Sequence, residues 1–499
     1  MKKKFIAIII ACLVCAEGYT QLEASNWFFG DSVLLKFSLD SIIVSKAFLS
    51  STEATSVISD INGELLYYTN TGFVYNVLHE PIHEEPIFGY SYNPFDPSNG
   101  NNSPEWSLIL NSPENPDTLF FLLTMDSTLS FTKIDRRLND GKGGIDDSAI
   151  NVLLGDTAIP MDTKLTSTRH ANGRDWWIFM RSHCTAEVQF FLRWLLKPEG
   201  FEGPDYIELT DWVEEEGWQF GNMFFSQDGK QLIVLERDGF EVYDFDRCSG
   251  ELEQVAIIQE SFVDNFHYAA LNGNGTRLYI SYANYETGSI DANTGILQYN
   301  LELLPDPDAV LSSAQVVFEE NYSLCGVKAL KYEPITDNIY FTIVTEDSVY
   351  SHNLYLHAIT APDNLGLTCN PVEGYLQIAS GPGGMRTLEG LPNMPNYALG
   401  ALEGSPCDTL NETNSVAEAT SLPFKAYPNP VQDYLYIDNP LQTTCQAVVY
   451  NAMGQEVASL LVQPGGQTLN TSAWSTGVYQ LIIQQESDNI WKQSLIKLE

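Results

Sequence analysis

Two histidines flank a glutamate near residue 80 in a pattern that zinc proteases use. His79, Glu80 and His83 match HExxH, in which both His lie on one face of a helix and bind zinc while the Glu acts as general base. Pro81 lies inside that stretch, and a proline there removes a backbone donor that a helix needs. The flanking residues are typical of a loop. We therefore predict a solvated surface loop and no metal site.

A second group of side chains with useful chemistry surrounds residue 170. Arg169 could pair with a carboxylate, His170 could act as a base, and Trp176 and Trp177 could stack on a sugar ring. The alternative is structural, because a buried arginine can satisfy backbone carbonyls or an acid and tryptophans often pack between sheets. We predict a ligand-binding role for these four residues and assign no catalytic residue.

Other signs of a cofactor or a reaction are weak in this sequence. The acidic stretch 211–217 could attract Ca²⁺, but it lacks the ordered spacing of an EF-hand loop. No GxSxG, Walker, dinucleotide-binding glycine or SxxK motif is present, so acyl, phosphoryl and hydride transfer lack a signature. We expect no cofactor, with Ca²⁺ left open. Whether the chain is an enzyme also stays open, and the missing motifs favour a non-catalytic protein.

Composition limits the classes of partner. The 499 residues contain 25 Lys plus Arg against 65 Asp plus Glu, for a formal net charge of −40. Nucleic acids and anionic membranes attract clustered basic residues, so both are disfavoured. Apolar residues make up 44% of the chain and aromatic residues 12%, which is ample for a core and argues against disorder.

The N-terminus is typical of a secretory signal peptide, which we place at residues 1–20. Three lysines after Met1 precede an apolar run over residues 5–16 that is too short to span a bilayer. No other stretch is long and apolar enough for a transmembrane segment in the mature chain. Two of the eight cysteines lie within the signal peptide. The remaining six permit disulfides in an exported chain, and the sequence leaves their fifteen pairings open.

Residues 26–407 contain a repeated unit in which a polar turn precedes a strongly apolar, aromatic strand. Gly, Asn and Asp supply the positive φ of tight turns, and β-branched and aromatic residues suit a half-buried strand. The unit recurs roughly every 45 to 60 residues, which favours a β-propeller. The six turns lie at residues 60–63, 114–117, 172–175, 227–230, 272–275 and 334–338.

We predict an all-β fold with a seven-bladed propeller, and six blades as the alternative. Residues 26–30, 33–38 and 42–45 look like strands that lack a first partner, and residues 391–394 look like a lone strand. Pairing these two regions would complete a seventh blade and close the ring. A two-sheet sandwich is the competing fold for this region.

The end of the chain forms a separate small domain in this interpretation. Residues 408–423 lack aromatic residues and have a linker composition. Residues 424–499 show a compact β pattern that contains Tyr427, Pro428, Asn429, Pro430, Asn451, Gly454, Gly477, Tyr479 and Lys497. With these residues the segment resembles the type A C-terminal sorting domain of the type IX secretion system of Bacteroidota, and the resemblance implies an Ig-like β-sandwich.

The resemblance implies a destination. Proteins of this family reach the periplasm by Sec export and cross the outer membrane through the type IX secretion machinery. A sortase usually removes the sorting domain, and the cargo is released or attached to the cell surface. The resemblance thus implies a secreted or surface location, with the machinery and a sortase as partners.

Residues 26–410 resemble uncharacterised secreted propellers of Bacteroidota, for example at residues 26–30, 165–177 and 391–397. That family has no agreed activity. We expect a non-catalytic binding or adhesion module with an extracellular glycan or protein ligand. The alternative is a secreted hydrolase or lyase that acts on polysaccharide or peptide at the mouth of the propeller channel.

Overall fold

The computed structural model divides into two compact units, residues 1–408 and residues 409–499. The expected signal peptide and most of the expected linker lie outside the described residues. The structure describes residues 22–87, 105–125, 129–155, 161–182, 189–212, 221–260, 265–285, 291–323, 326–345, 352–379, 384–408, 424–439, 443–451, 455–485 and 488–497.

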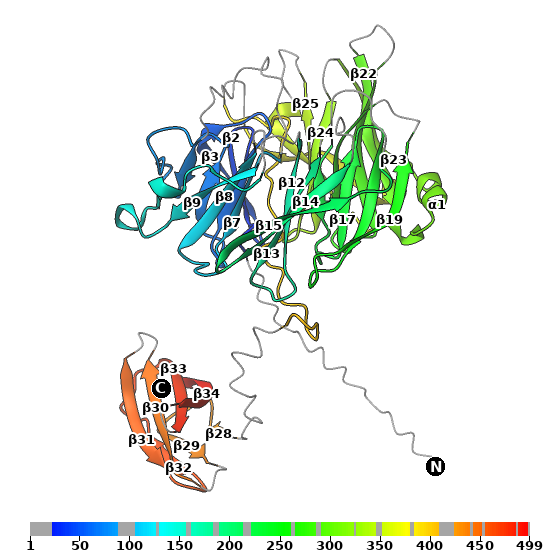
Figure 1. Cartoon of the computed structure of the whole chain (residues 1–499). Coiled ribbons are helices and arrows are strands. Elements are labelled where there is room, and N and C mark those ends of the chain that lie inside the picture. Colours follow the sequence, from blue (N-terminus) through cyan, green and yellow to red (C-terminus); the bar gives the residue numbers. More distant parts are fainter. Residues whose placement is uncertain are drawn as a thin grey trace, which may run out of the picture. The chain divides into compact units, whose positions relative to one another are not determined.

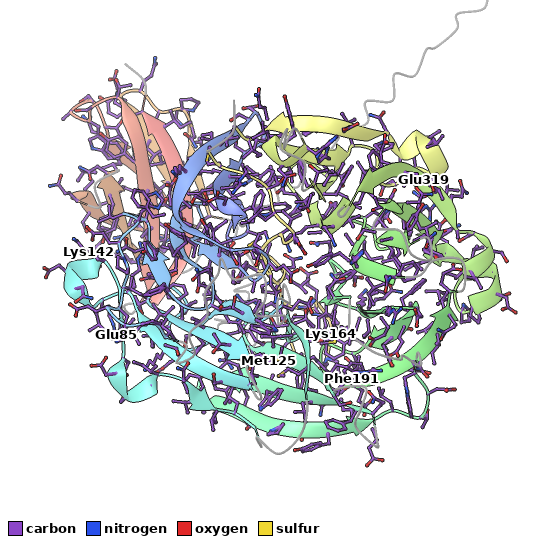
Figure 2. The ribbon with its side chains drawn as sticks, turned by 90° about the horizontal axis from the view of Figure 1, so that it is seen from above. Glu85, Met125, Lys142, Lys164, Phe191 and Glu319 are labelled. Carbon is purple, nitrogen blue, oxygen red and sulfur yellow. A yellow bond between two sulfur atoms is a disulfide. The ribbon has the colours of Figure 1, made fainter. Side chains whose placement is uncertain are left out.

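The described residues of the first unit form seven antiparallel sheets, the number that a seven-bladed propeller requires. Figure 2 looks down on these sheets, which follow one another around a ring from blue through cyan and green to yellow. This unit is a β-propeller.

The first three sheets consist of β1 (Asn26–Phe29), β2 (Asp31–Phe37) and β3 (Ile42–Ser50); β4 (Ser56–Ser59), β5 (Leu65–Thr69) and β6 (Val74–Asn76); and β7 (Ser107–Asn111), β8 (Leu119–Met125), β9 (Leu129–Asp135), β10 (Gly144–Ile145) and β11 (Val152–Leu153).

The next two sheets consist of β12 (Met161–Arg169), β13 (Trp176–Ser182), β14 (Phe190–Lys197) and β15 (Gly200–Glu208); and β16 (Met223–Phe225), β17 (Gln231–Glu236), β18 (Gly239–Phe245) and β19 (Leu252–Gln259).

The last two consist of β20 (Asn265–Leu271), β21 (Arg277–Tyr285), β22 (Asp291–Asn300) and β23 (Gln315–Ser323); and β24 (Gly326–Glu333), β25 (Asn338–Val344), β26 (Tyr355–Ile359) and β27 (Pro371–Gln377). The short helix α1 (Pro307–Ser312) precedes β23. None of the helices in the described part of the chain has the length and apolar character needed to cross a membrane.

All six predicted polar turns join the first strand of a sheet to its second strand. The turn after β4 shows the chemistry, because Asp60 Oδ1 accepts hydrogen bonds from the backbone N–H groups of Asn62 and Glu64 at 2.9 and 3.0 Å. Gly63 has φ 78°, a conformation that few other residues adopt. The turn sequences therefore fix the local hairpins, as the repeat predicted.

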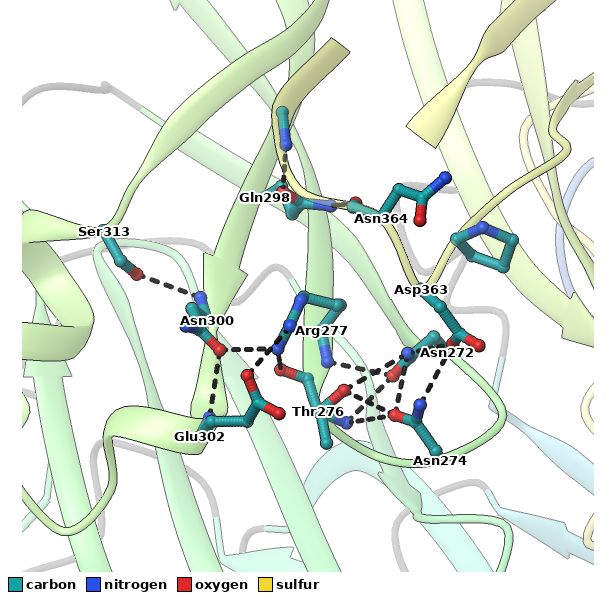
Figure 3. Close-up of polar contacts among 12 residues, drawn as sticks. Asn272, Asn274, Thr276, Arg277, Gln298, Asn300, Glu302, Ser313, Asp363 and Asn364 are labelled. Carbon is teal, nitrogen blue, oxygen red and sulfur yellow. Dashed lines mark hydrogen bonds and ion pairs between the residues drawn. The ribbon is translucent and has the colours of Figure 1, made fainter. Parts of the chain in front are cut away.

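The same turns also connect neighbouring sheets. In Figure 3 the side chains of Asn272 and Asn274, from the turn after β20, point toward Asp363, from the loop after β26. The Nδ2 atoms of the two asparagines donate to Asp363 Oδ1 at 2.6 and 3.2 Å. A polar contact thus joins the sixth sheet to the seventh at the turns.

The hydrophobic core lies between adjacent sheets. The second strands β13 and β25 are buried along their whole length. Each fully buried large apolar side chain contributes roughly 1.5 to 3 kcal/mol to stability. The tryptophans at 27, 176 and 194 are among the largest side chains in this core.

The first strands surround a central channel, which the chain itself fills. We call residues 386–400 the axial segment. Residues 391–396 of this segment line a cavity of about 110 Å³ together with residues from β12, β16, β20 and β24. The axial segment therefore occupies the place that is an open channel in a hollow propeller.

Side-chain hydrogen bonds hold the axial segment to first strands that are far apart in the sequence. Asn393 Nδ2 donates to the carbonyls of Ser107 at 3.2 Å and Leu165 at 3.1 Å. Tyr397 Oη donates to the carbonyl of Ile109 at 2.6 Å. One segment thereby ties the third sheet to the fourth.

This placement corrects the predicted closure of the ring. Residues 391–394 form no strand and do not pair with the first sheet, in which β1, β2 and β3 pair only with one another. Residues 391–394 contact the first sheet by apolar packing, with Leu391 in the same core cluster as Trp27. Just before them, Asp31 and Arg386 form an isolated bridge with an ion pair at 3.2 Å. The side-chain hydrogen bonds of Asn393 replace the strand pairing that we expected.

A disulfide fixes the chain where it leaves the ring. Arg247 Nη2 donates to the carbonyl of Gly400 at 2.6 Å, and Cys407 is bonded to Cys248 in the turn after β18. This bond answers part of the pairing question that the sequence left open. In the part of the chain that the structure describes, Cys369 and Cys445 are buried free thiols.

The second unit is a sandwich of two antiparallel sheets, as predicted. Its apolar core contains side chains from both sheets, including Leu435 and Leu481. One sheet contains β28 (Lys425–Tyr427), β29 (Tyr434–Asp438) and β32 (Gln467–Asn470), and the other contains β31 (Glu456–Val462), β30 (Cys445–Asn451), β33 (Gly477–Gln485) and β34 (Asp488–Lys497).

Candidate functional site

Arg169 is the last residue of β12, and its side chain is buried over Trp176. The guanidinium carbon lies 3.7 Å from the centre of the Trp176 ring. Nη1 donates to the carbonyl of Arg174 at 2.6 Å, and Nη2 donates to Asn111 Oδ1 at 2.9 Å. Nε has no partner in the described structure. Burial lowers the pKa of Arg169 to about 10. The charge is thus held by neutral oxygen atoms, and one donor is left over.

Arg169 lines a cavity of about 260 Å³, which lies between the second, third and fourth sheets and the end of the axial segment. The hairpin turns after β4, β7 and β12 contribute to its rim. We call it the Arg169 cavity. Its polar lining includes Glu23, Asp60 and Arg136, and its apolar lining includes Phe120 and Tyr397.

Glu23 brings a buried carboxyl group to the Arg169 cavity. The residue is 5% exposed, and its Oε2 atom has no hydrogen-bond partner among the described residues. Burial raises the pKa of this carboxyl, and a backbone hydrogen bond and the positive charge of Arg169 offset part of the rise. The terminal nitrogens of Arg169 bind Arg174 and Asn111 instead of Glu23. Opposite charges therefore line one cavity without neutralising each other directly.

Arg136 adds a second arginine with unused donors. It follows β9, and its backbone N–H donates to the carbonyl of Thr118 at 2.8 Å. Its half-buried side chain makes no hydrogen bond or ion pair with any residue that the structure describes. The next residue differs, because Arg137 binds both carboxylate oxygens of Asp135 at 3.0 and 2.8 Å.

Tyr397 forms part of the apolar wall of the Arg169 cavity. Its ring meets that of Trp176 edge-on, with 5.9 Å between the ring centres. Burial raises the pKa of its hydroxyl well above the ordinary range, so this group stays neutral. Leu66 and Phe120 are also buried along the wall. The axial segment thus helps to shape the cavity as well as filling the channel.

His170 does not face this cavity as a free base. Its Nδ1 accepts from the backbone N–H of Asn172 at 3.1 Å, and its Nε2 is 3.1 Å from the carbonyl of Cys248, to which it donates. Both ring nitrogens therefore hold the turn after β12 and the disulfide-bearing turn in place.

The two predicted tryptophans also have different surroundings. Trp176 is fully buried beneath Arg169, whereas Trp177 packs against Gly250 of the fifth sheet and donates from Nε1 to the carbonyl of Arg247 at 2.8 Å. The structure thus groups Arg169 with Trp176 and places Trp177 elsewhere. A ligand-binding role for Arg169, His170, Trp176 and Trp177 stays a prediction.

Glu23 and Arg136 are absent from the sequence-based site. Glu23 is one of 65 acidic residues and has no motif around it. Arg136 offered a weak signal, since basic residues are few and this one follows an apolar strand that pairs with a predicted strand.

The HExxH stretch consists of bends and an isolated bridge at Pro81, and it is not a helix. His79 Nδ1 lies 2.9 Å from the hydroxyl of Tyr68, while His83 Nδ1 lies 2.8 Å from the carbonyl of Glu85. The two histidines therefore have separate partners. The stretch is a loop, as predicted, but both histidines are partly buried rather than solvated. Among the described residues, no three His, Cys, Asp or Glu side chains cluster to hold a metal ion. Most of the acidic stretch 211–217 lies outside the described residues.

The first four residues of the predicted sorting motif are exposed. Tyr427 is 50% exposed, and Pro428, Asn429 and Pro430 are exposed as well. Asn429 Oδ1 accepts from the backbone N–H of Ile496 at 2.8 Å and so fixes these residues to β34.

The rest of that motif is mainly structural. Asn451 Oδ1 accepts from the N–H of Gln455 at 3.0 Å across a turn, and Gly477 begins β33. Tyr479 is buried and donates to the carbonyl of Ser475 at 2.8 Å. Lys497 is buried in β34, and Gly454 lies outside the described residues.

Residues 425–497 match the family described as a secretion system C-terminal sorting domain. The chain thus carries a type IX sorting domain, and its destination is the cell surface or the extracellular space. No curated protein matches the sequence significantly.

Solved propeller structures are similar to this chain only in outline. The Dos1 propeller has 7% identity, covers 72% of this chain and 86% of its own, and gives a TM-score of 0.36. The Cps50 (Swd1) β-propeller domain of Myceliophteria thermophila has 10% identity, covers 65% of this chain and 94% of its own, and gives a TM-score of 0.30. The putative TolB of Agrobacterium tumefaciens has 14% identity, covers 59% of this chain and 88% of its own, and gives a TM-score of 0.30. Scores this low carry no argument about activity.

Proposed function

We propose that this protein is an exported, non-catalytic binding or adhesion module whose ligand is an extracellular glycan or protein. The axial segment supports this proposal most strongly, because it fills the channel that a propeller enzyme uses to admit a substrate. A cavity of about 110 Å³ remains there, and the larger Arg169 cavity is lined by the ends of β4, β7 and β12 and by the end of the axial segment. The engaged nitrogens of His170 support the same conclusion.

The proposed route to this location has three steps. An N-terminal signal peptide in residues 1–20 directs the chain to the periplasm of a bacterium of the Bacteroidota. The type IX machinery then recognises the sorting domain and carries the chain across the outer membrane. A sortase removes the domain, and the propeller is released or attached to the surface.

A binding and turnover panel tests the proposed function. The purified full chain is presented to a glycan array and to extracellular proteins, and the same preparation is incubated with polysaccharide, peptide and ester substrates. We expect saturable binding without turnover. Turnover that is lost in the His170→Ala variant would instead support a hydrolase or lyase.

Deletion of residues 424–499 tests the route. We expect the shortened protein to accumulate in the periplasm, as measured by cell fractionation. Alanine substitution of Pro428, Asn429 and Pro430 tests the exposed opening of the motif. The matched control is Tyr434→Ala, because Tyr434 is 60% exposed and lies outside the motif. Normal surface display of the deletion variant would refute the route.

A further inference from the structure

The Arg169 cavity brings three arginines together in a strongly acidic protein. The whole chain has 25 Lys plus Arg and a net charge of −40, yet Arg136, Arg169 and Arg174 line this one cavity. Arg174 is paired with Asp175 at 2.7 Å, whereas the other two have no carboxylate partner in the described structure. Three carboxyl groups, those of Glu23, Asp60 and Asp117, also line the cavity, so it carries charges of both signs. The two arginines without a carboxylate partner are the groups in it that can take up an anion.

Unused hydrogen-bonding atoms show where a ligand would bind. Arg169 Nε and Glu23 Oε2 are both buried and unpartnered, and the guanidinium of Arg136 makes no bond to a described residue. A buried polar atom without a partner costs about 1 to 3 kcal/mol. A molecule that supplies an acceptor to the arginines and a donor to Glu23 recovers this free energy on binding.

We propose that the Arg169 cavity binds a small sugar acid, as a single molecule or as the terminal unit of an acidic glycan. The carboxylate of the ligand lies between Arg136 and Arg169, because guanidinium and carboxylate groups match in shape and charge. A hydroxyl of the same ring donates to Glu23. The C–H face of the ring packs on the apolar wall that Phe120 and Tyr397 provide. This proposal rests on the binding function proposed above.

The size and chemistry of the cavity favour this class over simpler ligands. A volume of about 260 Å³ lies below the range of drug-sized pockets, so one ring fits and an extended chain does not. A neutral sugar leaves the arginines without an anion, and an inorganic anion leaves the apolar wall and Glu23 without a partner.

Isothermal titration calorimetry of the purified full chain tests the proposal. Glucuronic and galacturonic acids are the probes, glucose is the uncharged twin, and glutamate represents a carboxylate beside an ammonium group. We expect saturable heat with at least one sugar acid and an affinity for glucose that is at least about tenfold weaker, because a charged hydrogen bond contributes about 1.5 to 3 kcal/mol. Tighter binding of glutamate than of both sugar acids would overturn the sugar assignment.

Two variants locate the binding within the cavity. Arg136→Ala and Glu23→Gln should each weaken sugar-acid binding by about tenfold or more. Arg137→Ala is the matched control, since Arg137 is adjacent in sequence and its side chain is 64% exposed. It should leave the affinity unchanged. Circular dichroism and the unfolding midpoint of each variant establish that the fold is intact.

The possible failures are distinguishable. No heat with either sugar acid at millimolar concentration, or equal affinity in the Arg136→Ala, Glu23→Gln and wild-type proteins, would overturn the cavity assignment. If the glycan array still reports a ligand whose binding ignores these variants, the binding function stands and the site lies elsewhere. If the chain turns over a substrate and binds no ligand in either binding experiment, the proposed non-catalytic binding function is wrong.

Discussion

Two buried arginines of the fourth sheet have opposite surroundings. Arg181 on β13 donates from Nη1 and Nη2 to the two carboxylate oxygens of Glu241 on β18, each at 3.0 Å. Tyr243 adds a hydrogen bond to the same carboxylate at 2.6 Å. Burial opposes the charge of Arg181, but Glu241 and its neighbour Glu236 outweigh burial and raise its pKa. Arg169 on β12 has no such carboxylate, and burial lowers its pKa to about 10.

The difference separates a structural contact from a binding site. Lys164 and Glu236 form a second ion pair at 2.8 Å between the fourth and fifth sheets, so that junction is neutral and complete. Buried pairs of this kind fix which surfaces meet, because a mismatched neighbour would leave a charge without a partner. The Arg169 cavity instead holds charged groups that have no directly bonded partner of opposite charge in the protein. A ligand can supply the missing partners.

The largest expected effect on stability concerns the ion pair between Arg181 and Glu241. Arg181→Met leaves Glu241 buried without its counterion, and we expect the free energy of unfolding to fall by about 3 to 5 kcal/mol. Denaturant unfolding measures the loss. The double variant Arg181→Met/Glu241→Leu removes both charges and should recover more than half of the stability. A loss below about 1 kcal/mol in the single variant would show that the pair is not a structural contact.

A smaller loss in the free energy of unfolding is expected at Arg169, which has no carboxylate partner. Arg169→Met removes two hydrogen bonds and the contact with the Trp176 ring, which together stabilise the fold by about 2 kcal/mol. The same denaturant series measures it. If this variant lost as much stability as Arg181→Met, Arg169 would be part of a closed charge pair and the contrast between the two regions would disappear.

The pH dependence of stability in the Glu23→Gln variant tests whether the carboxyl group of Glu23 lacks a partner in the folded protein. The pKa of Glu23 is raised in the folded protein, so its contribution to stability is present below the unfolded pKa near 4.5 and is lost as pH rises through the folded pKa. The charged groups that face it are Arg169 and Asp60, and Tyr397 lies nearby. Glutamine resembles the neutral acid. We therefore expect equal unfolding midpoints near pH 4 and a higher midpoint for the variant at pH 8.

The reverse dependence, with the variant less stable at pH 8, would mean that the ionised carboxylate of Glu23 is well paired in the folded protein. The Arg169 cavity would then be complete without a ligand. Glu64→Gln serves as the control, because this residue forms an exposed ion pair with Lys36 and should show little change across the same range.

The smallest expected effect on stability is at Arg136. Its side chain is half-buried and makes no bond to a described residue, so Arg136→Ala should change the free energy of unfolding by no more than about 0.5 kcal/mol. Together with a loss of ligand affinity, this would separate binding from folding at one residue. A loss above about 2 kcal/mol would indicate a structural role instead.

The sequence predicted the local hairpins well because each depends on residues a few positions apart. The turn at Asp60 uses its own side chain and a glycine, and both are visible in the sequence. The strands after the turns were predicted for the same reason. The two-sheet sorting domain followed from a resemblance that the family match at residues 425–497 confirms.

Long-range contacts escaped prediction. The hydrogen bonds of Asn393 to the third and fourth sheets join residues separated by 286 and 228 positions. Such bonds leave no periodic pattern, so residues 391–394 looked like a strand. The candidate site shows the same limit: Arg169 was identified, but Glu23 reaches the cavity only through the closed ring. The pairing of His170 with Cys248 likewise depends on two sheets meeting.

The bond between Cys248 and Cys407 has a mechanical consequence. Cys407 is followed by the residues that lead to the sorting domain, so tension applied to the tail during export reaches this bond before it reaches the axial segment. The load then passes to the turn after β18, and residues 249–406 are shielded from stretching. A pull on the tail can therefore move the whole propeller without extracting its central segment.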